Sequence, residues 1–296
     1  MRIVITGAGG FVGRALIRAL GDTHDVVAVD SCLNGAPGIE GDLGEPAILE
    51  RAFAGGCDAV VHLATVPGGA AERDPVLAKR VNLDAGMALI DVAAKAGKRP
   101  RFIFASSIAI FGDPLPALVD DATPVAPRMI YGAHKAMIEQ WVDTQTRRRA
   151  IAGLSLRLPG VVARPRGAAG MKSAFMSDLF HALKAGETIE LPVSPEATMW
   201  LMSATQVAAN LVHALSIDEA GAVTLPAQHV TMAALVSAIV RETGADKALV
   251  TYRPDAEVES GFGRQPSLST PRAEALGFGN DADIEALVAS ALAALG

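Results

Sequence analysis

The feature that most constrains the fold is a glycine pattern near the start of the chain, in the stretch RIVITGAGGFVG at residues 2–13. A short apolar run precedes the glycines, as in a buried parallel strand, and residues 15–20 after them have the apolar spacing of a helix. A strand, a glycine turn and a helix in that order are typical of a dinucleotide-binding unit. Gly7 allows the tight turn, Gly10 lets a pyrophosphate approach the backbone, and Gly13 lets the helix pack on the strand. We expect the free N–H groups at this helix start to face the anion.

The next expected strand, DVVAVD at residues 25–30, ends in an acid that can select the cofactor. Asp30 lies about 20 residues past the glycine turn, where a carboxylate accepts both hydroxyls of an adenosine ribose. It would repel the 2′-phosphate of NADP, and the following Cys32, Leu33 and Asn34 include no arginine to bind that phosphate. The sequence therefore predicts NAD, although an ordinary turn aspartate would fit the same position.

Other cofactor contacts are expected where the strands of such a sheet end. Gly41-Asp42-Leu43 falls in the loop after the third strand, where Asp42 is placed to bond the adenine amino group and Leu43 to contact the ring. The fourth strand is expected over residues 57–65. The residues at its carboxyl end should lie beside the pyrophosphate and ribose: Leu63, Ala64 and Thr65. His62, inside the same apolar strand, is expected to be a packed core histidine rather than a base.

Strands and helices alternate along the chain, which indicates an α/β fold. We expect a doubly wound parallel Rossmann sheet with a smaller, discontinuous α/β lobe that binds the substrate. The NAD-binding domain is predicted over residues 1–163 and 204–228, and the substrate lobe over residues 164–203 and 229–296. The PGGAA stretch at residues 67–71 is predicted to be a flexible loop at the carboxyl edge of the sheet.

Composition excludes several other classes of protein. The 296 residues carry a formal net charge of −6, and no basic tract stands out beyond Arg147–Arg149, so no nucleic-acid partner is expected. The two cysteines, Cys32 and Cys57, lack the spacing of metal ligands, and no metal site is expected. No apolar run approaches the ~18 residues of a membrane span, and no signal peptide precedes the first strand. We therefore expect a cytoplasmic protein that binds no membrane.

Three residues further along the chain suit the removal of a proton and a hydride from a secondary alcohol. Tyr131 and Lys135 are four residues apart on an expected helix over 129–149, so they lie on one face, one turn apart. A phenol has an ordinary pKa of about 10, and a nearby ammonium lowers that pKa by stabilising the phenolate. Ser107, near the end of an expected strand over 101–112, can bond the substrate oxygen. A Tyr–Lys pair at this spacing is common by chance. The glycine turn and the serine that precede it support the interpretation that this pair is catalytic.

These motifs together resemble the extended short-chain dehydrogenase/reductase superfamily, in its epimerase/dehydratase group, over nearly the full length of the chain. The resemblance rests on TGAGGFVG, Asp30, SSIAIFG and YGAHK. It implies that Ser107, Tyr131 and Lys135 are the catalytic triad. It also implies that Asn82 lies at the nicotinamide side of the cofactor.

The resemblance carries two further expectations. Cofactor contacts are expected from the start of the first helix and from the nicotinamide pocket: Phe11, Val12, Leu158, Pro159 and Val161. The helices near residues 84–96 and 131–148 would form the four-helix bundle of a homodimer.

Two departures from the superfamily pattern narrow the substrate. Nucleotide-sugar members usually carry an arginine before the last Rossmann helix, and Met199 of the MWLMS stretch stands in its place here. Dehydratase members carry Thr-Asp-Glu where this chain keeps Ser107. A narrower resemblance, to the D-erythronate dehydrogenases of the superfamily, rests on FGDPLPALVDDATPVAP, YGAHKA, LRLPGVVARPRG and MWLMS. It implies oxidation of the 2-hydroxyl of a four-carbon sugar acid with NAD.

A small acid requires a compact pocket and a cation. Arg164 and Arg166 follow the expected nicotinamide strand, and a guanidinium can hold a carboxylate through two hydrogen bonds. A surface pair of arginines would fit the sequence equally well. Trp200 is expected either to wall the substrate pocket or to be a core residue.

Three interpretations of the function follow. The leading one is an NAD-dependent dehydrogenase of a small hydroxy acid. The second is a sugar or nucleotide-sugar epimerase that keeps NAD bound and returns the hydride to the other face. The third is an NAD-binding redox regulator without turnover, which the complete Ser–Tyr–Lys set argues against, because a regulator needs no acid–base residue. Net release of NADH separates the first interpretation from the second.

Overall fold

The computed structural model describes residues 1–166 and 173–295. The sequence also predicts a Gly/Ala loop within residues 166–200, and its residues 167–172 lie outside the described residues. The chain divides into two compact units: unit 1 comprises Met1–Gly112, Pro124–Leu158 and Ala208–Thr224, and unit 2 comprises Asp113–Thr123, Pro159–Val207 and Leu225–Gly296. Four stretches that the sequence assigns to the NAD-binding domain group with unit 2: residues 113–123, 159–163, 204–207 and 225–228.

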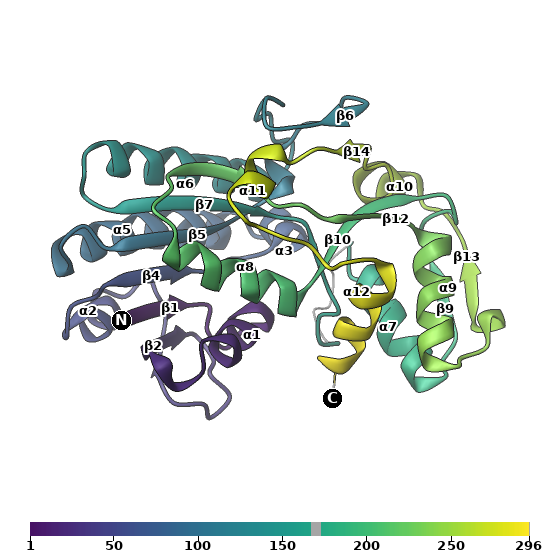
Figure 1. The fold of residues 1–296 in the computed structure, drawn as a ribbon, viewed down its shortest axis with the longest axis horizontal. Coiled ribbons are helices and arrows are strands. Elements are labelled where there is room, and N and C mark those ends of the chain that lie inside the picture. The colour runs from purple at the N-terminus through teal and green to yellow at the C-terminus, as the bar shows by residue number, and fades with distance from the viewer. Residues whose placement is uncertain (167–172, 296) are drawn as a thin grey trace. The chain divides into compact units, whose positions relative to one another are not determined.

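Unit 1 is built on a parallel sheet that has seven strands within the described residues (Figure 1). The strands, in order across the sheet, are β11 (Gly221–Thr224), β7 (Ala152–Leu158), β5 (Arg101–Ser107), β4 (Ala59–His62), β1 (Arg2–Thr6), β2 (Asp25–Asp30) and β3 (Ile39–Glu40). The chain runs outward from β1 to β3, then crosses to β4 on the other side of β1, which is the doubly wound order. The predicted fold class is therefore confirmed.

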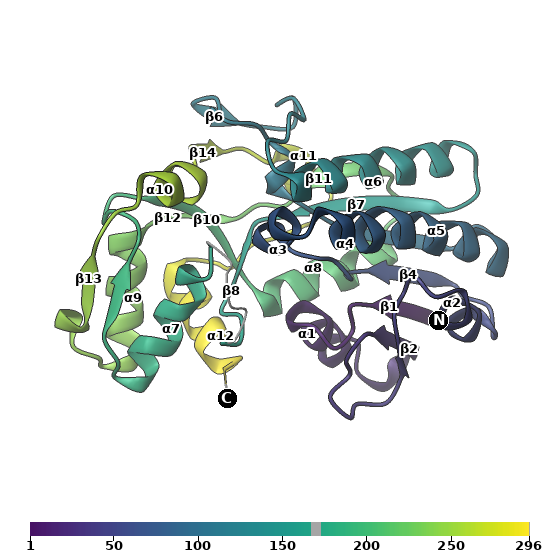
Figure 2. The same ribbon diagram turned by 180° about the vertical axis from the view of Figure 1, so that it is seen from behind.

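Helices cover both faces of this sheet, which is why its central strands are apolar on both sides. The helices of unit 1 are α1 (Phe11–Leu20), α2 (Pro46–Phe53), α3 (Gly68–Arg73), α4 (Pro75–Lys79), α5 (Ala85–Ala96) and α6 (Ile130–Arg147). Residues of α2, α5 and α6 share one buried cluster with Val4 of β1 and Phe102 of β5, and Figure 2 shows these three helices on one face of the sheet. Helix α1 lies on the opposite face (Figure 1), and its Leu16 is fully buried.

One local prediction in unit 1 is wrong. The PGGAA stretch begins helix α3 instead of forming a flexible loop. Pro67 precedes the helix, its carbonyl accepts a hydrogen bond from the N–H of Ala71, and Ala71 is fully buried. Burial of this small side chain fixes a glycine-containing stretch that has little helical propensity of its own.

Unit 2 contains smaller sheets and its own apolar core. Its strands are β6 (Leu118–Val119), β8 (Gly160–Val162), β9 (Ile189–Leu191), β10 (Thr198–Ser203), β12 (Gln228–Thr231), β13 (Val250–Tyr252) and β14 (Ser267–Leu268). Its helices are α7 (Phe175–Ala185), α9 (Met232–Thr243), α10 (Ala256–Phe262), α11 (Pro271–Ala275) and α12 (Ile284–Ala293), while α8 (Ala204–Ser216) runs from unit 2 into unit 1. The MWLMS stretch is most of β10, which pairs with β8 and β12 and packs Met199 and Leu201 in the core.

The described residues lack two features of the classes of protein considered above. No helix among them is both long enough and apolar enough to span a membrane. The described part of the chain also has no group of three or more His, Cys, Asp or Glu side chains arranged to hold a metal ion.

Candidate active site

The glycine turn brings the end of β1 against the end of β4. Gly7 has a φ of +74°, and a Cβ atom on it would lie 2.6 Å from the backbone nitrogen of Ala64. A Cβ on Gly13 would lie 2.2 Å from the carbonyl oxygen of Gly7, so α1 can approach the turn only with glycine there. Helix α1 begins at Phe11 and Val12, after Gly10, and no side chain caps its first N–H groups. This backbone cradle and its free donors fit the pyrophosphate of a dinucleotide.

Asp30 is held beside this cradle by two backbone amides. Its Oδ2 accepts a hydrogen bond of 2.9 Å from the N–H of Gly9, and its Oδ1 accepts one of 3.0 Å from the N–H of Cys32. The carboxylate therefore bridges the glycine turn and the loop after β2. Carboxylate oxygens at the end of this strand suit the hydroxyls of an adenosine ribose.

The Gly41-Asp42-Leu43 motif follows β3, as expected. The Asp42 carboxylate bonds the guanidinium of Arg80 and accepts a hydrogen bond of 2.8 Å from the N–H of Gly44. The bond from Arg80 is the main cause that lowers the pKa of Asp42 below its ordinary value. Leu43 is buried in the cluster beneath α2 and α5. The motif is thus a structured turn, with its acid already engaged by an arginine.

Asn82 fixes the loop that follows β4. It lies in a π-helical turn, Arg80–Asp84, just before α5, and only 5% of it is exposed. Its Oδ1 accepts hydrogen bonds from the N–H of Val66 at 2.7 Å and from the hydroxyl of Thr65 at 3.1 Å, while its Nδ2 donates to the Val66 carbonyl. Leu63, Ala64 and Thr65 are half-buried at the carboxyl end of β4. Such π-turns are frequent at functional sites, and this one places an amide side chain at the edge where a dinucleotide would bind.

A buried polar pair links the ends of the two central strands. Thr6 and His62 are paired in register across β1 and β4, and the Thr6 hydroxyl lies 2.6 Å from Nδ1 of His62. Burial, with a smaller effect of the Lys135 ammonium, lowers the pKa of His62 to about 3. The ring is therefore neutral at physiological pH, as expected of a core histidine.

Ser107 and Tyr131 lie on elements that make close backbone contact. Ser107 ends β5, and its hydroxyl accepts a hydrogen bond of 3.1 Å from the N–H of Ala109. A Cβ on Gly132 would lie 2.0 Å from the carbonyl oxygen of Ala109. The glycine after Tyr131 thus lets the first turn of α6 approach the turn that follows Ser107. Glu72 of α3 also accepts a hydrogen bond of 2.7 Å from the N–H of Ile130 and so holds the start of this helix.

Lys135 projects inward from α6 toward the end of β5. Its Nζ donates a hydrogen bond of 2.7 Å to the carbonyl oxygen of Ala105, and lies 4.7 Å from the ring centroid of Phe104 and 5.5 Å from that of Tyr131. Only 3% of the residue is exposed. Burial lowers the pKa of Lys135 to about 7, and the carboxylate of Glu139 partly opposes that decrease. An ammonium at this position stabilises a phenolate on Tyr131.

The remaining predicted residues lie at the end of β7 and in unit 2. Leu158 ends β7, Pro159 precedes β8, and Val161 is the middle residue of β8. Trp200 of β10 is 1% exposed, and its indole N–H donates a hydrogen bond of 2.7 Å to the carbonyl oxygen of Pro266. Its contacts are therefore those of a core residue within unit 2.

The two arginines after β8 have different surroundings. The backbone of Arg164 is held on both sides, because its N–H donates to Ser177 and its carbonyl oxygen lies 2.7 Å from Nε2 of His181. Its Nε donates to the carbonyl oxygen of Val161 at 3.3 Å. Arg166 forms an exposed ion pair with Glu187. Arg164 is thus the better ordered of the two candidates within unit 2.

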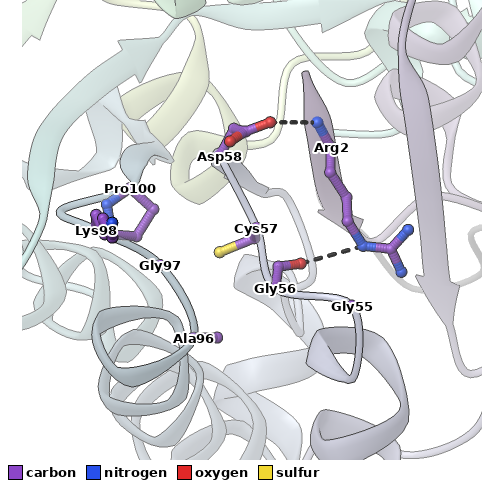
Figure 3. Close-up of a pocket in the computed structure, with 9 residues that line it drawn as sticks. All are labelled: Arg2, Gly55, Gly56, Cys57, Asp58, Ala96, Gly97, Lys98 and Pro100. Atoms are coloured by element: carbon purple, nitrogen blue, oxygen red, sulfur yellow. Dashed lines mark hydrogen bonds between the residues drawn. The ribbon is translucent and has the colours of Figure 1, made fainter.

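A cavity of about 410 Å³ lies at the opposite, amino end of the large sheet (Figure 3). There the backbone N–H of Arg2 bonds Asp58 and its Nε bonds the Gly56 carbonyl oxygen. Burial raises the pKa of the Cys57 thiol to about 11, and nearby Asp58 adds to the effect. A thiol in that state is a poor nucleophile, so this cavity brings together none of the predicted chemistry.

Comparison with known proteins decides the family. Residues 3–224 match the family described as the NAD dependent epimerase/dehydratase family. The chain belongs to that family. Its NAD-dependent chemistry, predicted from the glycine turn and Asp30, is thereby confirmed, together with the oxidoreductase class.

Two relatives within the family match almost the full length. A D-erythronate dehydrogenase from Cupriavidus necator is 35% identical, covering 97% of each chain. One from Haemophilus influenzae is 31% identical, covering 97% of this chain and 98% of the relative. The crystal structure of a nucleoside-diphosphate-sugar epimerase from Agrobacterium tumefaciens, 28% identical, matches with a TM-score of 0.86 over 97% of this chain and 92% of that one.

Sequence reasoning missed several residues that the structure places at the site. Gly132 belongs to the YGAHK motif, but only the close contact with Ala109 explains why it is glycine. Glu139 lies four residues past Lys135, a spacing that is visible in the sequence. Arg157 and Glu72 reach α6 from distant parts of the chain, and no local pattern indicates either contact.

Proposed function

We propose that this protein oxidises the 2-hydroxyl of a small sugar acid, D-erythronate, with NAD. The observation that carries the proposal is the near full-length similarity to two D-erythronate dehydrogenases. The arrangement in unit 1 supports it, because Lys135 lies near the ring of Tyr131 on an α6 whose first turn packs against the turn after Ser107.

The roles of the residues follow from their chemistry. NAD, when bound, supplies a hydride acceptor. Tyr131, as phenolate, takes the proton from the 2-hydroxyl of the substrate. The hydride leaves the carbon that carries this hydroxyl, so that the alcohol becomes a carbonyl. Lys135 stabilises the phenolate, and the Ser107 hydroxyl donates a hydrogen bond to the oxygen that becomes the carbonyl. The products are a 2-keto acid, a reduced cofactor and one proton.

A substrate panel tests the proposed function directly. D-Erythronate should reduce NAD with a steady increase in NADH absorbance, because the acid is oxidised with net loss of a hydride. NADP should be a poor substitute, since Asp30 repels its 2′-phosphate. UDP-glucose should not be epimerised, because Met199 stands where nucleotide-sugar relatives carry an arginine. Epimerisation of a UDP-sugar without NADH from any small acid would support the epimerase interpretation, and NAD binding without any turnover would support the regulator.

We also propose a homodimer in which α5 and α6 of two copies pack together. An apolar hollow of about 510 Å³ on this face is lined by residues including Met87 of α5 and Trp141 of α6. Met137 and Val125 on its border are 50% and 44% exposed. The indole N–H of Trp141 is buried without a hydrogen-bond partner in the described residues. A second copy would cover the exposed side chains.

The dimer makes a specific prediction for mass in solution. Light scattering should give twice the 30.5 kDa of one chain, and Met137→Glu should give a monomer, because a carboxylate would then be buried without a partner. Leu118→Glu is a matched control, since Leu118 is 48% exposed in unit 2, and it should leave the mass unchanged. A wild-type monomer would contradict the proposal.

The compartment is the last part of the proposal. Cys32 is exposed and Cys57 is buried, and both are free thiols. Free thiols are usual where the cell keeps proteins reduced. We therefore infer that the enzyme works in the cytoplasm.

A further inference from the structure

The inner face of α6 carries a second charged residue one turn past Lys135. Glu139 is 8% exposed, and two side chains from neighbouring strands bond its carboxylate. Arg157 of β7 donates from Nε to Oε1 at 3.1 Å and from Nη2 to Oε2 at 2.9 Å. Ser106 of β5, next to Ser107, donates its hydroxyl to Oε1. The carboxylate is therefore held in one position beneath the proposed active site.

The stability of the fold does not by itself explain a buried ion pair of this kind. Removing two charges from water costs free energy that their attraction repays only in part, so apolar residues of similar volume often stabilise a fold as well. The side chains of Arg157 and Glu139 are only 11% and 8% exposed. On one side of the pair, the guanidinium of Arg157 lies over the ring of Phe111, a buried residue. On the other side, Glu139 shares the face of α6 that carries Lys135.

Lys135 lies one turn before Glu139 on the same face of α6. Its ammonium is buried and close to losing its proton near neutral pH, because burial lowers its pKa and Glu139 is the charge that opposes the decrease. The charged or titratable groups around it in the described residues include Tyr131 and Glu139 on α6 and His62 on β4. His62 is neutral, so it supplies no compensating charge. Arg157 reaches this group through Glu139.

We propose that Glu139, anchored by Arg157 and Ser106, is a positioning residue that keeps Lys135 an ammonium and thereby sets the pH at which Tyr131 ionises. The inference rests on the proposed roles of Tyr131 and Lys135. Without the carboxylate, Lys135 becomes a neutral amine that no longer stabilises the phenolate. Without Arg157, the carboxylate acts on Lys135 unopposed. The two halves of one ion pair therefore have opposite effects.

The chain offers a direct measurement, because it has only two tyrosines, Tyr131 and Tyr252. In a Tyr252→Phe background, the ultraviolet absorbance of tyrosinate reports Tyr131 alone. Glu139→Gln should move this titration to higher pH by about one unit or more, the usual effect of a nearby charge. Glu139 lies two turns from Tyr131, so its direct effect on the phenol is smaller than the effect through Lys135. Arg157→Met should move the titration to lower pH.

The control variant is Glu139→Asp, which keeps the charge and should titrate close to the parent protein. Circular dichroism identifies a variant that fails to fold. If Glu139→Gln does not fold, Arg157→Met carries the test alone, because only a shift of its titration to lower pH relative to Glu139→Asp would support the proposal. The proposal would be overturned if the tyrosinate titration shifted in the same direction in Glu139→Gln and Arg157→Met, or did not shift in either. A purely structural role of the ion pair does not predict shifts of opposite sign. The titration uses neither substrate nor NAD, so its failure is distinct from a failure of the proposed function.

Discussion

Replacement of Tyr131 by phenylalanine should lower kcat for D-erythronate oxidation by about 10²-fold or more, the scale expected for loss of a general base. The ring is retained, so the packing of α6 on β5 should not change. Only the phenolic oxygen, which takes the substrate proton, is lost. NAD binding should survive, because the glycine turn and Asp30 are untouched. Steady-state kinetics and calorimetric titration with NAD measure the two quantities separately.

The chain supplies a matched control for this substitution. Tyr252 lies in β13 of unit 2, and burial raises its pKa, with nearby Glu196 adding to the effect. Tyr252→Phe removes the same oxygen from a group that ionises even less readily than an ordinary phenol. Its kcat should stay near that of the wild type. Near wild-type turnover in Tyr131→Phe would remove this residue from the mechanism.

Replacement of Arg164 by methionine should lower kcat/KM for the acid by about 10- to 100-fold, because a hydrogen bond to a charged group contributes about 1.5–3 kcal/mol. The loss should fall mainly on KM if the guanidinium binds the carboxylate equally in the ground and transition states. Affinity for NAD should be almost unchanged. Kinetics with D-erythronate and equilibrium binding of NAD give the two measurements.

Arg166→Met is the control for the neighbouring arginine. Arg166 is exposed and already paired with Glu187, so its loss should change kcat/KM much less. The reverse order, with the larger loss in Arg166→Met, would transfer the carboxylate contact to Arg166. Equal and small losses would place the substrate cation elsewhere in the chain.

The sequence alone predicted the parts of this protein that depend on local geometry. Gly7 and Gly13 form a recognisable pattern because the tight turn and the close helix contact leave no room for a Cβ atom at either position. The two positions lie only a few residues apart, so the pattern can be seen in the sequence. Tyr131 and Lys135 are visible because a helix brings residues four apart onto one face. The doubly wound sheet followed from the alternation of strands and helices, and the structure confirms it. The predicted loop at residues 67–71 is wrong because burial of Ala71, not propensity, makes residues 68–71 helical.

Only the tertiary structure decided which charges surround the predicted Tyr–Lys pair. Arg157 reaches Glu139 because β7 lies beside β5 in the parallel sheet, and this strand order is not encoded by any local spacing. Asn82 holds Val66 because a π-turn before α5 faces the end of β4. Spacing along the chain sets which residues share one turn or one face of a helix. Contacts between separate strands and helices form only when apolar burial assembles the sheet, and the electrostatics of the buried Lys135 depend on those contacts.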